Sequence, residues 1–325
     1  MAVFTELTVD EVKSALTGFD LGAFVDLKPI AGGIENTNYF LDTTKGRWVL
    51  TVFERLTPEQ LPFYLELCAH LKSHRCAVAA PVRNKAGKLF DFIHGKPYSI
   101  ANRLEGEGIE EVSVSECASM GAMLAHMHIA ALDFELYQEN LRGFKWIKAT
   151  APKIAPHVPA ELYAKLSDEV AYQETVYTSE AYSKLTVTAC HCDLFRNNTL
   201  IADHGTDKAH VAGVFDFYFA GCSPWLFDLA VTVNDWCIDL DTCQLDEDKT
   251  AAFLDHYHAV RPLTANEHAL WRDMLRAGAL RFWTSRLFDF YLPRPASLLT
   301  PHDPTHFERV LDDRKTCDLY WPPSG

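Results

Sequence analysis

The spacing of apolar residues changes near residue 103, and this change limits the possible fold more than any other feature of the chain. Before it, short β-like segments alternate with turns. These segments lie at residues 24–30, 38–44, 47–54 and 88–104, and the last is predicted to fold back on itself as a hairpin at Gly95. Residues 58–74 instead have the spacing of an amphipathic helix. The sequence therefore predicts a small sheet with one helix against it.

From residue 103 onward the spacing is mainly helical. Residues 113–131 place Met120, Met123, Leu124 and Met127 on one face, which we interpret as packing against the core. Further helices are predicted at 159–183, 224–236, 246–260 and 264–291, and short β-like runs at 186–190, 199–202 and 211–215. The predicted fold class is α+β, with a strand-rich lobe at residues 1–102 and a larger, mainly helical lobe at residues 103–325.

The bulk composition excludes several classes of partner. A net charge of −14 repels polyanions, so we expect neither nucleic acid nor an anionic membrane as the principal partner. No apolar run approaches the length of about eighteen residues that a membrane span needs. The N-terminal segment predicts a helix capped by Thr8 and Glu11, and not a signal peptide. Nine cysteines without a Cys-x-x-Cys pair predict a cytoplasmic location, with Cys190 and Cys192 as small core residues.

A glycine pair lies in the turn between the first two β-like segments. Gly32 and Gly33 are followed by the small polar residues Asn36 and Thr37. Glycine lets the backbone approach a ligand closely, and exposed amides in such a turn can bind phosphate oxygens. We therefore interpret this segment as a candidate nucleotide loop, although an ordinary hairpin turn explains the same residues. It is not a Walker A loop, because no Gly-Lys-Ser/Thr follows.

The segment HCDLFRNN, residues 191–198, carries the candidate chemistry. Asp193 is a candidate proton acceptor for an attacking hydroxyl, and Asn198 offers an oxygen ligand to a metal ion. Asp216 follows the later apolar run at residues 211–215 and offers a second ligand. We interpret His191 as a structural residue that hydrogen-bonds the loop backbone. Each feature alone has an ordinary explanation as a loop or turn. Their order after a glycine turn indicates phosphoryl transfer that depends on ATP and Mg²⁺.

The same segment resembles the aminoglycoside-phosphotransferase-like kinases. Their motif His-Gly-Asp-x-x-x-x-Asn is matched by the segment 191–198, with Cys192 in place of Gly, and Asp216 matches their later Asp. WLFDLA resembles their Asp-Leu-Ala helix start, where we interpret Asp228 as a structural N-cap contact. The resemblance implies a two-lobed protein kinase-like fold with a five-stranded antiparallel sheet in its N-terminal lobe. It also implies that adenine binds the backbone near Asn102 and Leu104.

Within that family, five segments spread over nearly the whole chain resemble the homoserine kinase subgroup. They read GGIENTNYFL, MLAHMHIAALDF, HCDLFRNNTLI, GVFDFYFAGCSPWLFDLAVTVNDWC and LRFWTSRLFD. Kinase-like folds usually have Lys or Arg in the third strand, whereas this chain resembles the subgroup in having Thr51 there. Glu66 is a candidate for the helix acid that pairs with that lysine, and a solvated helix face is the alternative explanation. The resemblance implies transfer of the γ-phosphate of ATP to the hydroxyl of L-homoserine, with Mg²⁺ and with Thr51 beside the nucleotide.

Homoserine is a zwitterion, so its site needs one acidic and one basic group. Asp235 is a candidate for the ammonium, and the planar fork of Arg281 matches a carboxylate. A salt bridge between these two residues is the alternative explanation. The alternative functions are a kinase of another small alcohol, of the choline, methylthioribose or aminoglycoside type, and a degenerate kinase fold that binds nucleotide without catalysis.

Overall fold

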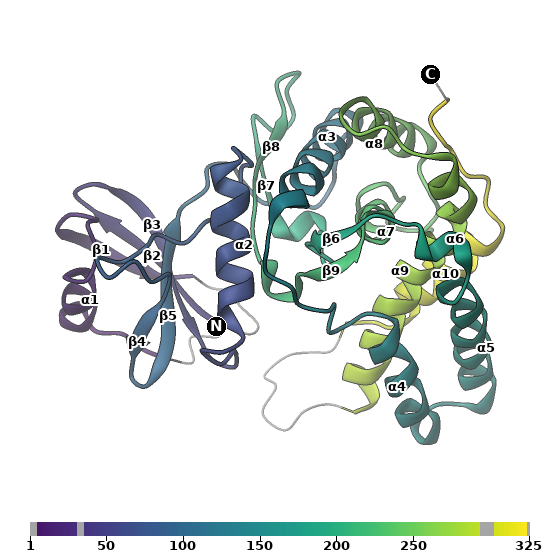
Figure 1. Ribbon diagram of the computed structural model, residues 1–325, viewed down its shortest axis with the longest axis horizontal. Helices are drawn as coiled ribbons and strands as arrows, with labels where there is room; N and C mark the ends of the chain where they lie inside the picture. Colours follow the sequence, from purple (N-terminus) through teal and green to yellow (C-terminus); the bar gives the residue numbers. More distant parts are fainter. Residues whose placement is uncertain (1–4, 31–35, 293–301, 324–325) are drawn as a thin grey trace. The chain divides into compact units, whose positions relative to one another are not determined.

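The computed structural model describes residues 5–30, 36–292 and 302–323. The chain divides into two compact units (Figure 1). Unit 1 comprises Met1–Glu105 and Gly213–Phe215, and unit 2 comprises Gly106–Ala212 and Asp216–Gly325. The change in apolar spacing places the boundary between residues 102 and 103, and a short piece from much later in the chain also joins unit 1.

Unit 1 contains a five-stranded sheet whose neighbouring strands pair antiparallel, which confirms the predicted sheet. The strand order is β1-β2-β3-β5-β4. The strands are Phe24–Pro29 (β1), Asn36–Thr43 (β2), Gly46–Phe53 (β3), Asp91–Ile93 (β4) and Lys96–Asn102 (β5). The β4–β5 hairpin turns at Gly95, whose φ of 74° lies in the left-handed region that favours glycine. The register sets Thr51 opposite Asn38 on β2 and Ser99 on β5.

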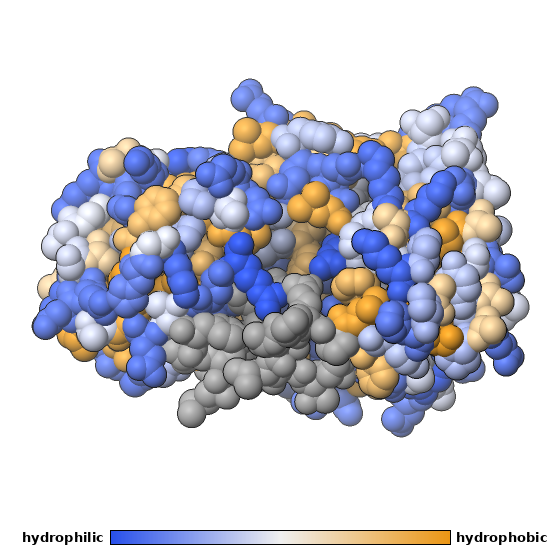
Figure 2. Space-filling model, turned by 90° about the horizontal axis from the view of Figure 1, so that it is seen from below, coloured by the Kyte–Doolittle hydropathy of each residue, from blue (hydrophilic) through white to orange (hydrophobic). Residues whose placement is uncertain are grey.

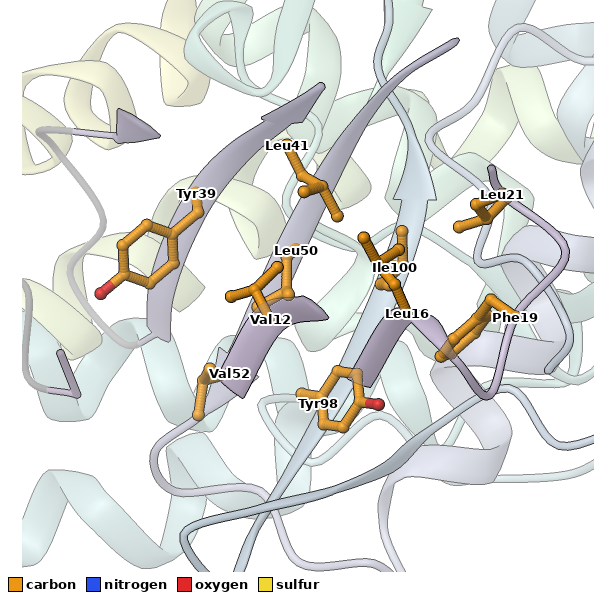
Figure 3. Close-up of a cluster of buried hydrophobic side chains, with 10 residues drawn as sticks. All are labelled: Val12, Leu16, Phe19, Leu21, Tyr39, Leu41, Leu50, Val52, Tyr98 and Ile100. Carbon is orange, nitrogen blue, oxygen red and sulfur yellow. The ribbon is translucent and has the colours of Figure 1, made fainter. Parts of the chain in front are cut away.

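One face of this sheet packs against helix α1 (Val9–Leu16), and their apolar side chains form a core (Figure 3). The capping box predicted for α1 is present, because Glu11 N–H donates to Thr8 Oγ1 and Thr8 N–H donates to Glu11 Oε2. The second helix of unit 1 is α2 (Leu61–Ser73). The core residues are Val12, Leu16, Phe19, Leu21, Tyr39, Leu41, Leu50, Val52, Tyr98 and Ile100.

Unit 2 is mainly helical, as predicted. Its helices are α3 (Val114–Ala130), α4 (Phe144–Ile154), α5 (Ala160–Tyr177), α6 (Glu180–Ser183), α7 (Trp225–Trp236), α8 (Glu247–Val260), α9 (Ala265–Tyr291) and α10 (Thr305–Thr316). Helix α3 packs against α8, and α9 packs against α7 and α10 (Figure 1). A Cβ at Gly121 of α3 would lie 2.1 Å from the main-chain oxygen of Phe253 in α8, so glycine permits this close approach. Met120, Leu124 and Met127 are buried, which confirms their interpretation as core residues, whereas Met123 of the same predicted face is only half-buried.

The remaining strands form two short two-stranded sheets. These sheets pair β6 (Val187–Cys190) with β9 (Gly221–Pro224) and β7 (Thr199–Ala202) with β8 (His210–Val214). The sequence predicts β6, β7 and β8 but misses β9, α4 and α10. Helix α10 buries Phe307, Val310 and Leu311. Their helical spacing is the one sequence feature that indicates this helix. Its other residues are strongly polar, so the apolar periodicity is weak along most of its length.

No helix among residues 5–30, 36–292 and 302–323 is both long and apolar enough to cross a membrane. On the face drawn in Figure 2, hydrophilic residues are interspersed with small groups of hydrophobic ones. Single exposed apolar side chains are normal for a folded chain.

Candidate active site

The predicted catalytic segment lies between two strands of unit 2. Strand β6 ends at Cys190, a 3₁₀ turn covers Arg196–Asn198, and β7 begins at Thr199. Cys192 has a φ of 64°, in the left-handed region that favours glycine. The family motif has glycine at this position, so the local backbone explains that preference. Cys190 and Cys192 are both buried and pack with Trp225, which confirms their predicted place in the core.

Asp193 and Asn198 are in direct contact. The Asn198 side-chain Nδ2 donates to the main-chain oxygen of Asp193 at 2.8 Å and lies 3.4 Å from Asp193 Oδ2. Because the amide nitrogen faces Asp193, the amide oxygen faces the other way. His191 is buried, and its Nδ1 accepts the N–H of Asp193 at 3.3 Å. This bond confirms the interpretation of His191 as a structural residue of the loop.

Asp216 belongs to the same unit as this loop. It follows β8 and begins the 3₁₀ turn Phe217–Phe219 with φ 63° and ψ 55°, a left-handed conformation that Asp tolerates better than most residues. Its carboxylate is near enough to Asp193 for its charge to help raise the pKa of that residue. The structure therefore brings together the three residues predicted for catalysis and metal binding.

The electrostatic surroundings of Asp193 suit a proton acceptor. Burial raises the pKa of Asp193 to about 7, the charge of Arg281 opposes this rise, and the charge of Asp216 adds to it. The Arg281 Nη2 lies 3.8 Å from Asp193 Oδ1, and the Arg281 side chain is only 5% exposed. Burial also lowers the pKa of Arg281 to about 10, so the guanidinium stays charged at neutral pH. A base with a pKa close to neutral is well matched to proton transfer.

Aromatic rings contact the guanidinium of Arg281. Its guanidinium carbon lies 4.0 Å from the centre of the Phe282 ring and 5.6 Å from that of Phe219. At 3.8 Å the approach to Asp193 is too long for a hydrogen bond. Among the residues that the structure describes, none accepts a hydrogen bond from this guanidinium. A buried planar donor group therefore lies beside the candidate base.

Asp228 accepts hydrogen bonds from the loop that carries Asp193, and it does not cap its own helix. It lies within α7, accepts the N–H of Cys192 at 2.7 Å through Oδ1, and accepts that of His191 at 3.2 Å through Oδ2. His128 Nε2 lies 3.1 Å from the same Oδ2. Burial by itself would raise the pKa of Asp228, but the hydrogen bond and charge of His128 hold it below its usual value. The predicted structural role is confirmed, whereas its predicted form is wrong, because Asp228 binds the loop that carries Asp193 and not its own helix end.

Replacing Asp228 by Asn is expected to lower the free energy of unfolding by about 3–5 kcal/mol, the usual cost of breaking a buried charged pair. The Asn side chain has an NH₂ group in place of one carboxylate oxygen. This NH₂ group cannot accept the backbone N–H that the oxygen accepted. Denaturant unfolding of the variant and the parent protein measures this change. A loss below about 1 kcal/mol would contradict the role given to Asp228.

Asp235 and Arg281, the two predicted substrate residues, do not pair with each other. Asp235 Oδ2 instead accepts the backbone N–H of Arg196 at 2.8 Å and the Arg196 Nε at 3.1 Å. The alternative explanation of a salt bridge between Asp235 and Arg281 is therefore wrong. Arg196 lies inside the catalytic segment but was not recognised from the sequence, since nothing local indicates that its partner lies 39 residues away.

Of the residues predicted to bind nucleotide, Gly32 and Gly33 lie outside the described residues. Thr37 turns its Oγ1 to the carboxylate of Glu54 at 2.7 Å. Thr51 Oγ1 donates to Asn38 Oδ1 at 2.8 Å, so this third-strand position carries a neutral pair. The helix acid Glu66 pairs with Arg83 Nη2 at 2.7 Å.

The other predicted nucleotide residues also lie in unit 1. Asn36 begins β2 and is buried. The Asn102 side chain is already engaged, because its Oδ1 accepts the N–H of Ala80 at 2.9 Å. Leu104 lies close to Gly213, where an added Cβ would come within 2.5 Å of its side chain. The backbone N–H of Asn102 is engaged as well, because it donates to the main-chain oxygen of Ala80 at 3.2 Å.

Comparison with known proteins agrees with this arrangement. The model of the phosphotransferase enzyme family (APH) matches residues 26–263. A homoserine kinase of Paraburkholderia phytofirmans is 51% identical over 319 residues, which cover 97% of this chain and 96% of that protein. A homoserine kinase of a Janthinobacterium species is also 51% identical, over 96% of this chain and 95% of that protein.

Solved structures of related kinases have the same fold. An amicoumacin kinase in complex with AMP-PNP and Ca²⁺ aligns with a TM-score of 0.68 at 14% identity, over 95% of this chain and 92% of that one. An aminoglycoside phosphotransferase from Alicyclobacillus acidocaldarius aligns with a TM-score of 0.66 at 15% identity, over 97% and 96%. The predicted α+β, two-lobed, protein kinase-like fold is therefore confirmed. The chain belongs to the phosphotransferase enzyme family and, within it, to the homoserine kinases.

Proposed function

We propose that this protein transfers the γ-phosphate of ATP to the hydroxyl of L-homoserine to give O-phospho-L-homoserine, with Asp193 as the proton acceptor. The observation that carries this proposal is the buried guanidinium of Arg281, 3.8 Å from the Asp193 carboxylate. A base and an unfilled carboxylate-binding fork lie side by side, which suits a small hydroxy acid. Nine free cysteines support the reducing cytoplasm as the place of the reaction.

Asp193 has the geometry and the pKa to accept the proton of the attacking hydroxyl. Asn198 holds the Asp193 backbone through its 2.8 Å bond, and His191 holds it from the other side. With a pKa near 7, the carboxylate is sufficiently basic to assist an alcohol at neutral pH. In phosphoryl transfer, such positioning and electrostatic stabilisation supply most of the rate enhancement.

We propose Asn198 and Asp216 as the ligands of Mg²⁺. The donor set fits a hard divalent cation, because it consists of a carboxylate and an amide oxygen that faces away from Asp193. The mutual repulsion of Asp193 and Asp216, which contributes to the raised pKa of Asp193, would also be relieved by a cation. When bound, the metal would neutralise charge on the ATP phosphates.

Asn198→Ala and Asp216→Ala are each expected to raise the concentration of Mg²⁺ needed for half-maximal activity. Each substitution removes one ligand oxygen, so the remaining site holds the cation less tightly. Titration of activity with MgCl₂ at a fixed ATP concentration measures the shift. An unchanged Mg²⁺ requirement in both variants would contradict the ligand assignment.

For ATP, we propose that adenine binds the backbone near Asn102 and Leu104. We propose that the backbone amides of the segment from Gly32 to Thr37, which includes Asn36, bind the phosphates. The neutral pair of Thr51 and Asn38 supports a nucleotide site without a third-strand lysine. We therefore infer that Thr51 does not supply the charge that lysine provides in related folds.

For homoserine, we propose Arg281 as the partner of the carboxylate, since its donors have no acceptor among the described residues. Binding of a carboxylate would fill two of these donors in a bidentate pair. Asp235, which the sequence suggested for the ammonium, is paired with Arg196 instead.

A coupled assay of ADP release against a panel of small alcohols tests the proposal. L-homoserine is expected to give the highest kcat/KM. Preferred turnover of choline, methylthioribose or an aminoglycoside would instead support the alternative of another alcohol kinase. ATP binding without turnover of any alcohol would support a degenerate binding fold.

A further inference from the structure

Two carboxylates on helix α7 hold the catalytic loop on either side of Asp193. Asp228 and Asp235 lie seven residues apart, which places them on one face of the helix about two turns apart. Asp228 accepts the backbone N–H groups of the loop residues before Asp193, with Cys192 N–H at 2.7 Å. Asp235 accepts the backbone N–H of Arg196, after Asp193, at 2.8 Å. One rigid helix thus contacts both ends of the short segment that carries the base.

The side chain of Arg196 strengthens the second of these contacts. Its Nε lies 3.1 Å from Asp235 Oδ2, and its Nη2 lies 3.2 Å from Oδ1 and 2.6 Å from the main-chain oxygen of Asp235. Its Nη1 donates to the main-chain oxygen of Glu110 at 2.9 Å. The Arg196 and Asp235 side chains are only 11% and 12% exposed. Both oxygens of Asp235 are therefore engaged, and a substrate ammonium would have to displace a guanidinium that fits them.

An aromatic contact holds the middle of the same loop. The ring of Phe195 lies 4.4 Å from that of Phe282 on α9 and 5.8 Å from that of Phe307 on α10. The Phe282 and Phe307 rings also stack on each other at 5.1 Å. Phe195 is therefore fixed to two helices, while the Arg196 backbone beside it is fixed to α7.

We propose that Asp235 is a positioning residue, which acts through Arg196 to fix the catalytic loop and so the place of Asp193. It is not a ligand of the substrate ammonium. This inference rests on the proposed function, because the position of the loop affects turnover only if Asp193 assists the reaction. A displacement of a catalytic group by about 1 Å can lower a rate by about 10²-fold.

The test compares Asp235→Asn with the wild-type protein in steady-state kinetics with homoserine and ATP. We expect kcat to fall by about 10²-fold, with the KM for homoserine changed less than about twofold. L-2-aminobutyrate, which has the ammonium and carboxylate of homoserine but no hydroxyl, is used as a competitive inhibitor. Its inhibition constant reports ammonium binding independently of the slowed chemistry, and we expect it to be unchanged. Turnover by the wild-type protein is measured first, so a failure of the proposed function would already appear there.

Substitutions of Arg196 test the same contact from the other side. Arg196→Ala keeps the bond from its backbone N–H to Asp235 and loses the side-chain contacts, so it should lower kcat, but by less than Asp235→Asn does. The double variant should lose no more than Asp235→Asn alone, because both substitutions act on the same anchor. Arg196→Lys keeps the charge pair, and with it the fold, but loses the planar fork. Arg196→Lys should lower kcat less than Arg196→Ala does and should leave the inhibition constant of L-2-aminobutyrate unchanged. If Asp235→Asn does not fold, Arg196→Lys provides the test.

A matched control comes from another partly buried pair of unit 2. Glu169 accepts from Arg276 Nη2 at 2.7 Å and from Nε at 3.1 Å, with side chains 2% and 13% exposed. Glu169→Gln should lower the melting temperature and leave kcat unchanged. An equal loss of kcat in this control would overturn the proposal, and so would a normal kcat in Asp235→Asn. A raised inhibition constant for L-2-aminobutyrate in Asp235→Asn would overturn it as well and assign Asp235 to the ammonium.

Discussion

Replacing Asp193 by Asn is expected to lower kcat by about 10²-fold or more, because general-base assistance contributes about 10²–10⁴-fold to such reactions. Asn has nearly the same size as Asp, and the bond from Asn198 Nδ2 to the main-chain oxygen of residue 193 does not depend on the side chain. The loop should therefore keep its conformation while it loses its proton acceptor. Steady-state kinetics with saturating ATP and homoserine measure the loss.

ATP affinity in the same variant is expected to change little, since the proposed nucleotide residues lie elsewhere in the chain. Calorimetric titration with a non-hydrolysable ATP analogue checks this. The control is Asp168→Asn, which makes the same chemical change at an exposed position of α5 and should leave kcat unaffected. Near-normal turnover by Asp193→Asn would show that the base has been wrongly assigned.

The second large effect is expected in the choice of substrate. Homoserine should be preferred over 3-aminopropan-1-ol, which lacks the carboxylate, by a factor on the order of 10⁴ in kcat/KM. Binding of the analogue would leave the Arg281 guanidinium unpaired in a site where it is only 5% exposed. Initial rates of ADP release for the two alcohols measure this ratio. Equal turnover would support the general alcohol kinase.

Arg281→Lys is expected to raise the KM for homoserine by about 10- to 100-fold, which corresponds to one lost charged hydrogen bond. Lys keeps the charge but cannot reproduce the bidentate fork. The KM for ATP should stay nearly constant. Arg276→Lys is the matched control, because it makes the same substitution on the same helix at a residue that pairs with Glu169. A rise of equal size in the control would remove the support for a carboxylate site at Arg281.

The elements that the sequence predicted well are those with strong local signals. The capping box of α1, the turn at Gly95 and the apolar spacing of α7, α8 and α9 each depend on residues a few positions apart. Helix α4 has a proline at residue 152 within it, and α10 is mostly polar, so their local patterns were weak. Their positions depend on packing against α9, which no local pattern records.

Within the candidate site, the sequence by itself indicated the residues that we propose for the chemistry. Asp193 and Asn198 lie in one short loop, so their spacing alone predicted that they act together, and the structure places them in contact. Asp216 could be recognised as a candidate metal ligand because it directly follows an apolar strand. The expectations of a reducing compartment and of no nucleic-acid partner likewise depend only on composition, because they rest on the nine cysteines and the net charge of −14.

Only the tertiary structure decided which carboxylate pairs with which guanidinium. Asp235 and Arg281 are both plausible substrate ligands in the sequence, but helix packing sets Asp235 against Arg196 and leaves Arg281 beside Asp193. The same packing places Asp228, which the sequence suggested as a helix cap, where it accepts the backbone N–H of Cys192. The physical reason is that a charged side chain pairs with its nearest neighbour in space, and that neighbour is set by how α7 and α9 pack around the loop.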